Sequence, residues 1–139
     1  MRILFDTNVV LDVLLDRPPH AHAASALFAL VERDEIEGLL GATSVTTVYY
    51  LTEKAAGPAR ARRYLQSLLS IFEVAPVDER VLSSAMNLRL PDFEDAVLHE
   101  AARRAGATGI VSRDAAGFAR GRLPVYEPSR LLEMIEALG

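Results

Sequence analysis

Residues 2–12, which read RILFDTNVVLD, constrain the fold of this chain more than any other stretch. Ile3, Leu4 and Phe5 form a short apolar run, which is typical of a strand buried on both faces of a parallel sheet. The run ends at Asp6, and apolar residues then recur at helical spacing. A carboxylate therefore stands where a buried strand gives way to a helix, and this edge of an open α/β sheet is where ligands bind. A second interpretation is that Asp6 only caps the helix, since aspartate is a preferred N-cap residue.

The rest of the chain alternates between strand-like and helix-like segments. We expect further strands at residues 36–41, 73–77, 109–112 and 123–126. We expect helices after Asp6, over 20–33, 43–56 and 60–72, after Asp78, over 91–105, and from Pro128 onward. Strands that alternate with helices predict an α/β fold with a central parallel sheet and helices on both faces. No linker, repeat or low-complexity segment divides the chain, so residues 1–139 are expected to form a single domain.

Composition and charge narrow the class of protein further. The 139 residues are half hydrophobic and about a quarter charged, which is a globular composition, and the apolar runs are far too short to span a bilayer. There are no cysteines, which excludes disulfides and thiolate metal sites, and a cytoplasmic protein is the simplest inference. The net charge of −4 argues against binding nucleic acid by bulk attraction alone, but it is compatible with a local basic rim around an acidic site.

Three more aspartates are expected to join Asp6. Asp114 follows the strand expected at 109–112, and Asp92 and Asp95 are three residues apart on one face of an expected helix. Carboxylates gathered at one place repel one another, and a divalent cation is the usual way to neutralise them. Hard oxygen ligands favour Mg²⁺ or Mn²⁺, which can activate a water for attack on a phosphodiester. Each aspartate taken singly is explained about equally well as a helix cap or first-turn acid, so the joint pattern carries this interpretation.

Four segments of the chain resemble the PIN domain family, in particular the branch that includes VapC-type toxin ribonucleases. They read FDTNVVLD at 5–12, SVTTVYYLTEK at 44–54, PDFEDAVLHEAA at 91–102 and IVSRDAAGF at 110–118, and the resemblance covers essentially the whole chain. It implies a Rossmann-like three-layer α/β/α sandwich. It also implies a Mg²⁺- or Mn²⁺-dependent ribonuclease that hydrolyses RNA, acting as the toxin of a type II toxin–antitoxin pair with a cognate antitoxin.

The resemblance also assigns roles to individual residues. Asp6, Asp95 and Asp114 match the family's metal-binding acids. Asn8 matches a polar residue that supports the first acid or a metal-bound water, and Ser112 matches a hydroxyl position beside the last acid.

The chain departs from the family pattern at one position. Many members carry a glutamate where this chain has Tyr50. Either Glu53 substitutes for it or Asp92 supplies the missing carboxylate. We favour Asp92, because it shares a helix face with Asp95 and begins that helix near the strand ends. The alternative to an active enzyme is a catalytically weak or inactive PIN-like module that acts through protein or RNA binding.

Several other side chains complete the expectations. Arg113, Arg120 and Arg122 are the candidates for a rim that contacts RNA phosphates, since guanidinium groups suit bidentate phosphate contacts. We expect Asp12 to be a surface acid or cap, and His99 to be a surface or interface residue. Apolar helix faces in excess of the needs of the core suggest a homodimer.

An aspartyl-phosphate protein is a weaker interpretation of Asp6. Proteins of that type usually carry a second acid two residues later and a lysine after a later strand. This chain has Asn8 at the first of these positions, and its only lysine, Lys54, lies far from the later strands.

Overall fold

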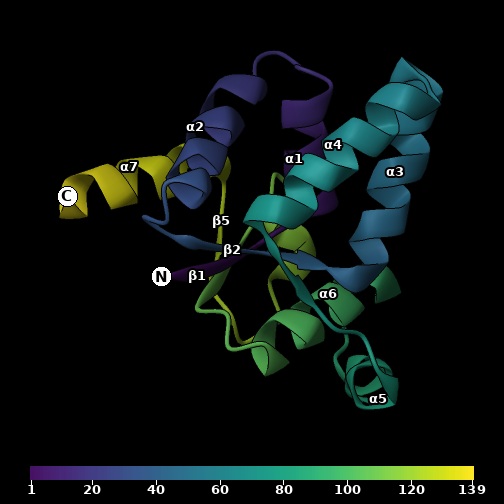
Figure 1. Ribbon diagram of the computed structural model, residues 1–139. Helices are drawn as coiled ribbons and strands as arrows, with labels where there is room; N and C mark the ends of the chain where they lie inside the picture. The colour runs from purple at the N-terminus through teal and green to yellow at the C-terminus, as the bar shows by residue number, and fades with distance from the viewer.

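The computed structural model describes residues 1–139, and its centre is a five-stranded, entirely parallel sheet with the strand order β3-β2-β1-β4-β5 (Figure 1). The strands are β1 (Arg2–Phe5), β2 (Glu37–Gly41), β3 (Glu73–Ala75), β4 (Gly109–Val111) and β5 (Val125–Tyr126). The helices are α1 (Thr7–Leu14), α2 (Ala21–Glu32), α3 (Ala42–Ala56), α4 (Pro58–Ile71), α5 (Glu79–Asn87), α6 (Phe93–Arg104), the 3₁₀ helix η1 (Ala115–Phe118) and α7 (Pro128–Leu138). The predicted α/β fold class is confirmed.

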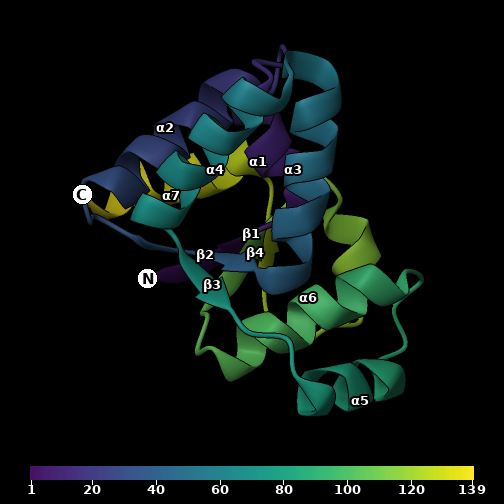
Figure 2. The same ribbon diagram turned by 45° about the vertical axis from the view of Figure 1, so that its right-hand side comes forward.

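Helices cover both faces of the sheet, as the alternation along β1 requires. Ile3 and Phe5 lie in an apolar cluster with α1, α2, α3, α4 and α7, whereas Leu4 lies in a second cluster with α5 and α6. The two views agree that α5 and α6 lie on the opposite side of the sheet from α2 and α4 (Figures 1 and 2). Because successive residues of a strand point to opposite faces, the continuous apolar run at residues 3–5 is what a strand between two helical layers needs.

The strand order indicates where on this sheet a ligand would bind. The chain winds from β1 through β2 to β3 in one direction, and then crosses back to add β4 and β5 on the other side of β1. The strand order therefore reverses between β1 and β4, and ligands of open α/β sheets bind at such a switch point, beyond the carboxyl ends of the strands. Asp6 follows β1 at this point, and its backbone N–H donates to the carbonyl of Val111 at the end of β4 over 3.0 Å.

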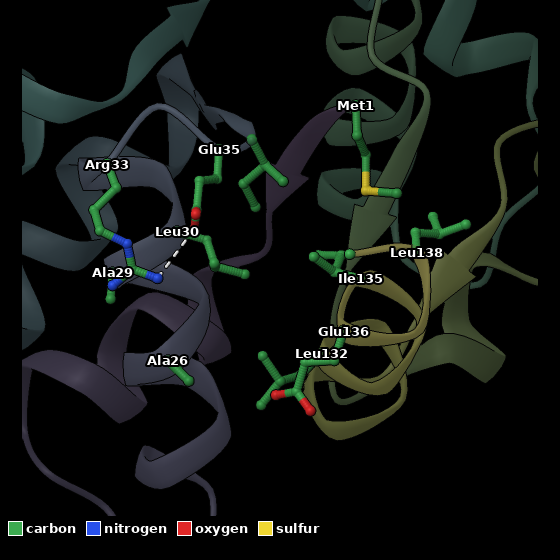
Figure 3. Close-up of a pocket in the computed structure, with 12 residues that line it drawn as sticks. Met1, Ala26, Ala29, Leu30, Arg33, Glu35, Leu132, Ile135, Glu136 and Leu138 are labelled. Atoms are coloured by element: carbon green, nitrogen blue, oxygen red, sulfur yellow. Dashed lines mark hydrogen bonds and ion pairs between the residues drawn. The ribbon is translucent and has the colours of Figure 1, made fainter.

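The opposite edge of the sheet carries an apolar pocket of about 660 Å³ between α2 and α7 (Figure 3). Met1 and Ile36, which line it, directly precede β1 and β2, so this pocket lies at the amino ends of the strands. None of the four candidate aspartates lines it. None of the helices in the chain combines the length and the hydrophobicity that a membrane span needs.

Candidate functional site

All four candidate aspartates line one pocket at the carboxyl edge of the sheet. It has a volume of about 420 Å³ and is lined by residues of α1 and its two flanking segments, of α3, of the start of α6 and of the segment after β4. We call it the acidic pocket; its polar lining consists of Asp6, Thr7, Asn8, Arg17, Thr47, Asp92, Glu94, Asp95, Arg113 and Asp114. The convergence predicted from the strand ends and the helix face is thus present in the structure.

Asp6 is the most buried of the four acids and is held by three donors. Its Oδ1 accepts the backbone N–H of Thr7 at 2.8 Å, and its Oδ2 accepts the hydroxyl of Ser112 at 2.6 Å and the amide of Asn8 at 3.5 Å. Burial raises the pKa of Asp6, the Ser112 and Thr7 hydrogen bonds oppose that rise, and nearby carboxylates add to it. Asn8 and Ser112 therefore both contact Asp6, as the family resemblance implies for Asn8.

Ser112 also joins the first acid to the last one. The backbone N–H of Asp114 donates to Ser112 Oγ at 2.9 Å, while the Ser112 hydroxyl donates to Asp6. The Asp114 side chain caps η1 by accepting the N–H of Gly117 at 3.3 Å. One serine thus fixes the relative positions of Asp6 and Asp114 across the switch point.

Asp92 and Asp95 enter the acidic pocket from the first turn of α6. Asp92 is the N-cap, and its Oδ1 accepts the backbone N–H groups of Glu94 at 2.7 Å and Asp95 at 3.3 Å. The half-buried Asp95 carboxylate accepts no hydrogen bond from any protein group. Burial, followed by the negative charges of Asp6, Asp92 and Asp114, raises the pKa of Asp95 to about 7. Asp95 is therefore the acid whose charge is least compensated by the protein.

Gly117 leaves room for two of these carboxylates. A Cβ atom at this position would lie 2.7 Å from Asp114 Oδ2 and 3.2 Å from Asp95 Oδ2. The two oxygens therefore border the same small space, and any side chain at position 117 would intrude on it.

Three of the four aspartates are both helix caps and members of the shared acidic site. Asp6, Asp92 and Asp114 are the N-cap residues of α1, α6 and η1, and each also lines the acidic pocket. Asp95 is not a cap. Capping occupies one oxygen each of Asp92 and Asp114 and leaves the other without a protein donor.

The donor set suits a hard divalent cation, because it consists of carboxylate oxygens, and Asp95 has no other partner. In the present side-chain arrangement, however, no three histidine, aspartate or glutamate side chains are close enough together to hold one ion. A cation at this site would therefore require the carboxylates to rotate toward one another.

Asp12 binds the two arginines that line the acidic pocket. The prediction that Asp12 is a surface acid or cap is wrong, because its side chain is fully buried and forms ion pairs with Arg17 at 2.8 Å and Arg113 at 2.7 Å. Both arginines also contact Asn8: Arg17 donates to its carbonyl, and the backbone N–H of Arg113 donates to its side-chain oxygen. The available signal was the spacing of Asn8 and Asp12, which share a helix face.

Three of the predicted site residues, Arg120, Arg122 and Glu53, do not line the acidic pocket. Arg120 lines a neighbouring pocket and Arg122 lines a third, so only Arg113 of the three predicted rim arginines borders the acids. Thr47 is the residue of α3 that reaches the acidic pocket, and Glu53 does not line it. Of the two residues considered for the missing acid, Asp92 is the one at the pocket.

His99 is a core residue rather than the predicted surface or interface residue. It is fully buried; its Nε2 accepts the backbone N–H of Leu123 at 3.1 Å, and its Nδ1 lies 2.7 Å from a carboxylate oxygen of Glu100. Because Nε2 is an acceptor, the ring proton is assigned to Nδ1, which donates to Glu100. His99 thereby fastens the loop after η1 to α6.

Together, these observations define a Rossmann-like α/β protein with an acidic pocket at the switch point of its sheet. A sequence model described as a PIN domain matches residues 2–116, a range that includes all four aspartates. The chain belongs to the PIN domain family, as its four motif segments predict.

Several solved structures share this fold. VapBC2 from Rickettsia felis, bound to a DNA fragment from its promoter, matches with a TM-score of 0.71 and 15% identity over 91% of this chain and 98% of that one. VapC20 from Mycobacterium tuberculosis, described as a toxin that cleaves the sarcin-ricin loop, matches with a TM-score of 0.69 and 16% identity over 86% and 95%. A toxin–antitoxin complex from Klebsiella pneumoniae matches with a TM-score of 0.69 and 22% identity over 91% and 97%. The comparison with curated proteins gives no match.

Proposed function

We propose that this protein is a Mg²⁺- or Mn²⁺-dependent endoribonuclease that hydrolyses RNA phosphodiester bonds. The observation that carries the proposal is the convergence of Asp6, Asp92, Asp95 and Asp114 from separate chain segments on one pocket at the switch point. The raised pKa of Asp95 supports it, because it marks a carboxylate whose neighbours repel its charge and whose ionised form a cation would stabilise.

In this proposal each acid has a distinct part. Asp6, Asp95 and Asp114 would hold the cation, with Asp92 as a fourth acid. A bound cation would polarise the scissile phosphate and acidify the attacking water. The hydrogen bonds from Ser112 and from the backbone of Thr7 orient the Asp6 carboxylate and favour its ionised form, against the effect of burial. Arg113, which pairs with Asp12 beside the acids, would contact a phosphate of the bound strand.

The biological role that fits this chain is the toxin of a type II toxin–antitoxin pair. Support comes from family membership and from the fold shared with solved toxins and toxin–antitoxin complexes. A cognate antitoxin would then cover the acidic pocket and silence the enzyme. The test is expression in a bacterial host, which should arrest growth with the natural sequence and not with an Asp6→Asn variant, and co-expression of a small protein encoded beside it should restore growth.

The enzymatic proposal is tested with purified protein and single-stranded RNA. Cleavage should require Mg²⁺ or Mn²⁺ and stop on addition of EDTA, and Asp6→Asn and Asp95→Asn should each lower the rate about 100-fold or more. Asp34→Asn is the matched control, because Asp34 is an exposed aspartate outside the acidic pocket. Cleavage that persists in EDTA, or equal rates in all three variants, would contradict the assignment.

A second candidate function is a weak or inactive PIN-like module that binds protein or RNA. It is favoured by Tyr50, which stands where many family members have a glutamate, and by the lack of a ready three-ligand group. Binding of Mn²⁺, measured by electron paramagnetic resonance, separates the two candidates. The nuclease should bind the ion and lose it in Asp95→Asn, whereas the module should bind its partner with the same affinity in EDTA.

A further inference from the structure

The segment at residues 90–95 separates the acidic pocket from a second pocket of about 660 Å³. Asp92 and Asp95 line the acidic side of this segment, whereas Pro91 and Phe93 line the other side. We call the second one the Phe93 pocket. Its other walls come from the end of α5, from the loop between α5 and α6, and from Arg120 in the loop after η1. Helices α5 and α6 lie next to each other in the lower part of the molecule in Figure 2.

Phe93 is an exception among the five phenylalanines of the chain. Phe5, Phe28 and Phe72 pack edge to face with one another in the core, and Phe118 is buried. Phe93 is 49% exposed in the first turn of α6, between Asp92 and Asp95. Met86, which is 71% exposed, lines the same pocket, so the two side chains give it an exposed apolar surface beside the charged one. Exposed apolar patches with a polar rim are typical of binding sites.

The charges that line the Phe93 pocket are exclusively positive. Arg89 and Arg120 are its only ionisable lining residues, and neither forms an ion pair or hydrogen bond within the protein, unlike Arg113 with Asp12. Free guanidinium groups around an apolar floor are complementary to phosphates that flank an aromatic base. They also offset the repulsion that a polyanion would meet at the neighbouring aspartates.

We propose that the Phe93 pocket binds one unpaired nucleobase of the RNA strand, stacked on the Phe93 ring, while Arg89 and Arg120 contact the phosphates on either side of that base. The proposed function supplies the position of the scissile phosphodiester, over the adjoining acidic pocket. The pocket requires a single-stranded or looped substrate, because a base held in a duplex is stacked between its neighbours and cannot reach the ring. Stacking on an aromatic ring tolerates any base, so this contact selects for structure and not for sequence.

The chain contains no tryptophan, which permits a direct test. Phe93→Trp, made in an Asp95→Asn background to stop cleavage, introduces a single indole whose fluorescence a stacked base quenches. A short single-stranded RNA should quench it, whereas the same strand with abasic residues, or its duplex form, should not. Leu69→Trp in the same background is the matched control, because Leu69 is 48% exposed on α4, across the sheet from the pocket, and its fluorescence should not change.

Affinity provides a second, independent measurement. In the Asp95→Asn background, Phe93→Ala should weaken binding of the single-stranded RNA about 5- to 150-fold and leave binding of the abasic strand unchanged. Leu69→Ala should bind as the parent does. Circular dichroism and the Tm show whether each variant remains folded, which the exposure of both side chains favours.

Two results would overturn the inference. One is equal quenching by the abasic and the natural strand, or an unchanged affinity in folded Phe93→Ala. The other is quenching by a cognate antitoxin but not by RNA, which would make the Phe93 pocket a protein-docking surface. Failure of the nuclease proposal is distinguishable, because base-dependent quenching without metal-dependent cleavage by the natural sequence would preserve the base pocket and reject the enzyme.

Discussion

At the scale of single residues, the four aspartates of the acidic pocket differ in how many hydrogen bonds the protein donates to their carboxylates. Asp6 receives three hydrogen bonds, Asp92 and Asp114 accept helix N–H groups, and Asp95 receives no donor. The same chemical group thus has four different environments within one pocket. Because Asp95 is the least compensated, it is the residue at which a change of pH or a bound cation should have the largest effect.

The raised pKa of Asp95 predicts how stability depends on pH. The folded protein keeps a proton on Asp95 up to about pH 7, whereas an unfolded aspartate releases it near pH 4. The stability from this group is therefore complete below about pH 4 and is lost as the pH rises through about 7. In EDTA, the Tm of the natural sequence should fall between pH 5 and pH 8, and Asp95→Asn should flatten that fall and raise the Tm at pH 8.

Calorimetry in matched buffers measures this effect, and Asp34→Asn should change the Tm by the same amount, if at all, at every pH. Adding Mg²⁺ at pH 8 should raise the Tm of the natural sequence and have little effect on Asp95→Asn, since only the ionised carboxylate attracts the ion. A lower Tm for Asp95→Asn than for the natural sequence at pH 8 would refute this account of the charge.

The buried Asp12 predicts a positioning role that is separable from catalysis. Asp12→Asn keeps the shape of the side chain but removes the charge that holds Arg17 and Arg113. The free energy of unfolding should fall by about 2 kcal/mol, because hydrogen bonds to charged groups are lost while the two partly exposed arginines can still be hydrated. For RNA cleavage, KM should rise more than kcat falls. Urea denaturation and steady-state kinetics test this. A fall in kcat with an unchanged KM would argue against a positioning role.

At the scale of secondary-structure elements, the acids of the pocket lie at the N-terminal ends of helices. Asp92 both caps α6 and lines the acidic pocket, and two substitutions separate these roles. Asp92→Ala should cost about 1 kcal/mol of stability through loss of the cap. Asp92→Asn retains a capping oxygen and should be nearly neutral for stability, yet it should reduce cleavage if Asp92 is the fourth acid. Glu53→Gln, on α3 and outside the pocket, should leave cleavage unchanged; the opposite ranking of the two variants would assign the acid to Glu53.

The loop after η1 depends on a close approach to α6. A Cβ atom on Gly121 would lie 2.6 Å from both Cδ2 and Nε2 of the buried His99. Gly121→Ala should therefore displace the loop, break the hydrogen bond from Leu123 to His99, and cost about 1–3 kcal/mol. Gly139→Ala, where a Cβ meets nothing closer than 3.7 Å, is the control and should be neutral. Thermal unfolding tests both variants, and a Gly121→Ala protein as stable as the control would show that the loop accommodates the methyl group.

The features that could be predicted from the sequence are those that depend on residues close together in the chain. Apolar runs, helical spacing and caps identified the strands, the helices after them, and the aspartates that converge at the strand ends. The burial of Asp12 and His99 was missed, because each depends on a partner that the local pattern does not reveal. Arg113 is 101 residues from Asp12 in the sequence, and Leu123 contacts His99 from a loop that carries no periodic pattern. Polar residues in a core are predictable only once their partners are placed.

At the scale of the whole molecule, the two edges of the sheet have opposite characters. The amino edge carries the apolar pocket between α2 and α7 (Figure 3). The carboxyl edge carries the aspartates and the unpaired arginines Arg89 and Arg120. The net charge of −4 disfavours binding of RNA by bulk attraction, so the RNA binding that we propose would depend on a few arginines near the aspartates. Such binding should have a weak dependence on salt.

The salt dependence can be predicted from the number of phosphate contacts. Each phosphate of a single strand that is neutralised contributes about −0.7 to the slope of log affinity against log salt concentration. If Arg89, Arg113 and Arg120 make three contacts, the slope for the Asp95→Asn protein should be about −2, and Arg120→Ala should reduce it to about −1.4. Arg33→Ala is the matched control, because Arg33 pairs with Glu35 and lines the pocket at the opposite edge, and its slope should equal that of the parent. A slope near zero, or an equal change in the two variants, would show that the charges at the carboxyl edge do not bind the strand.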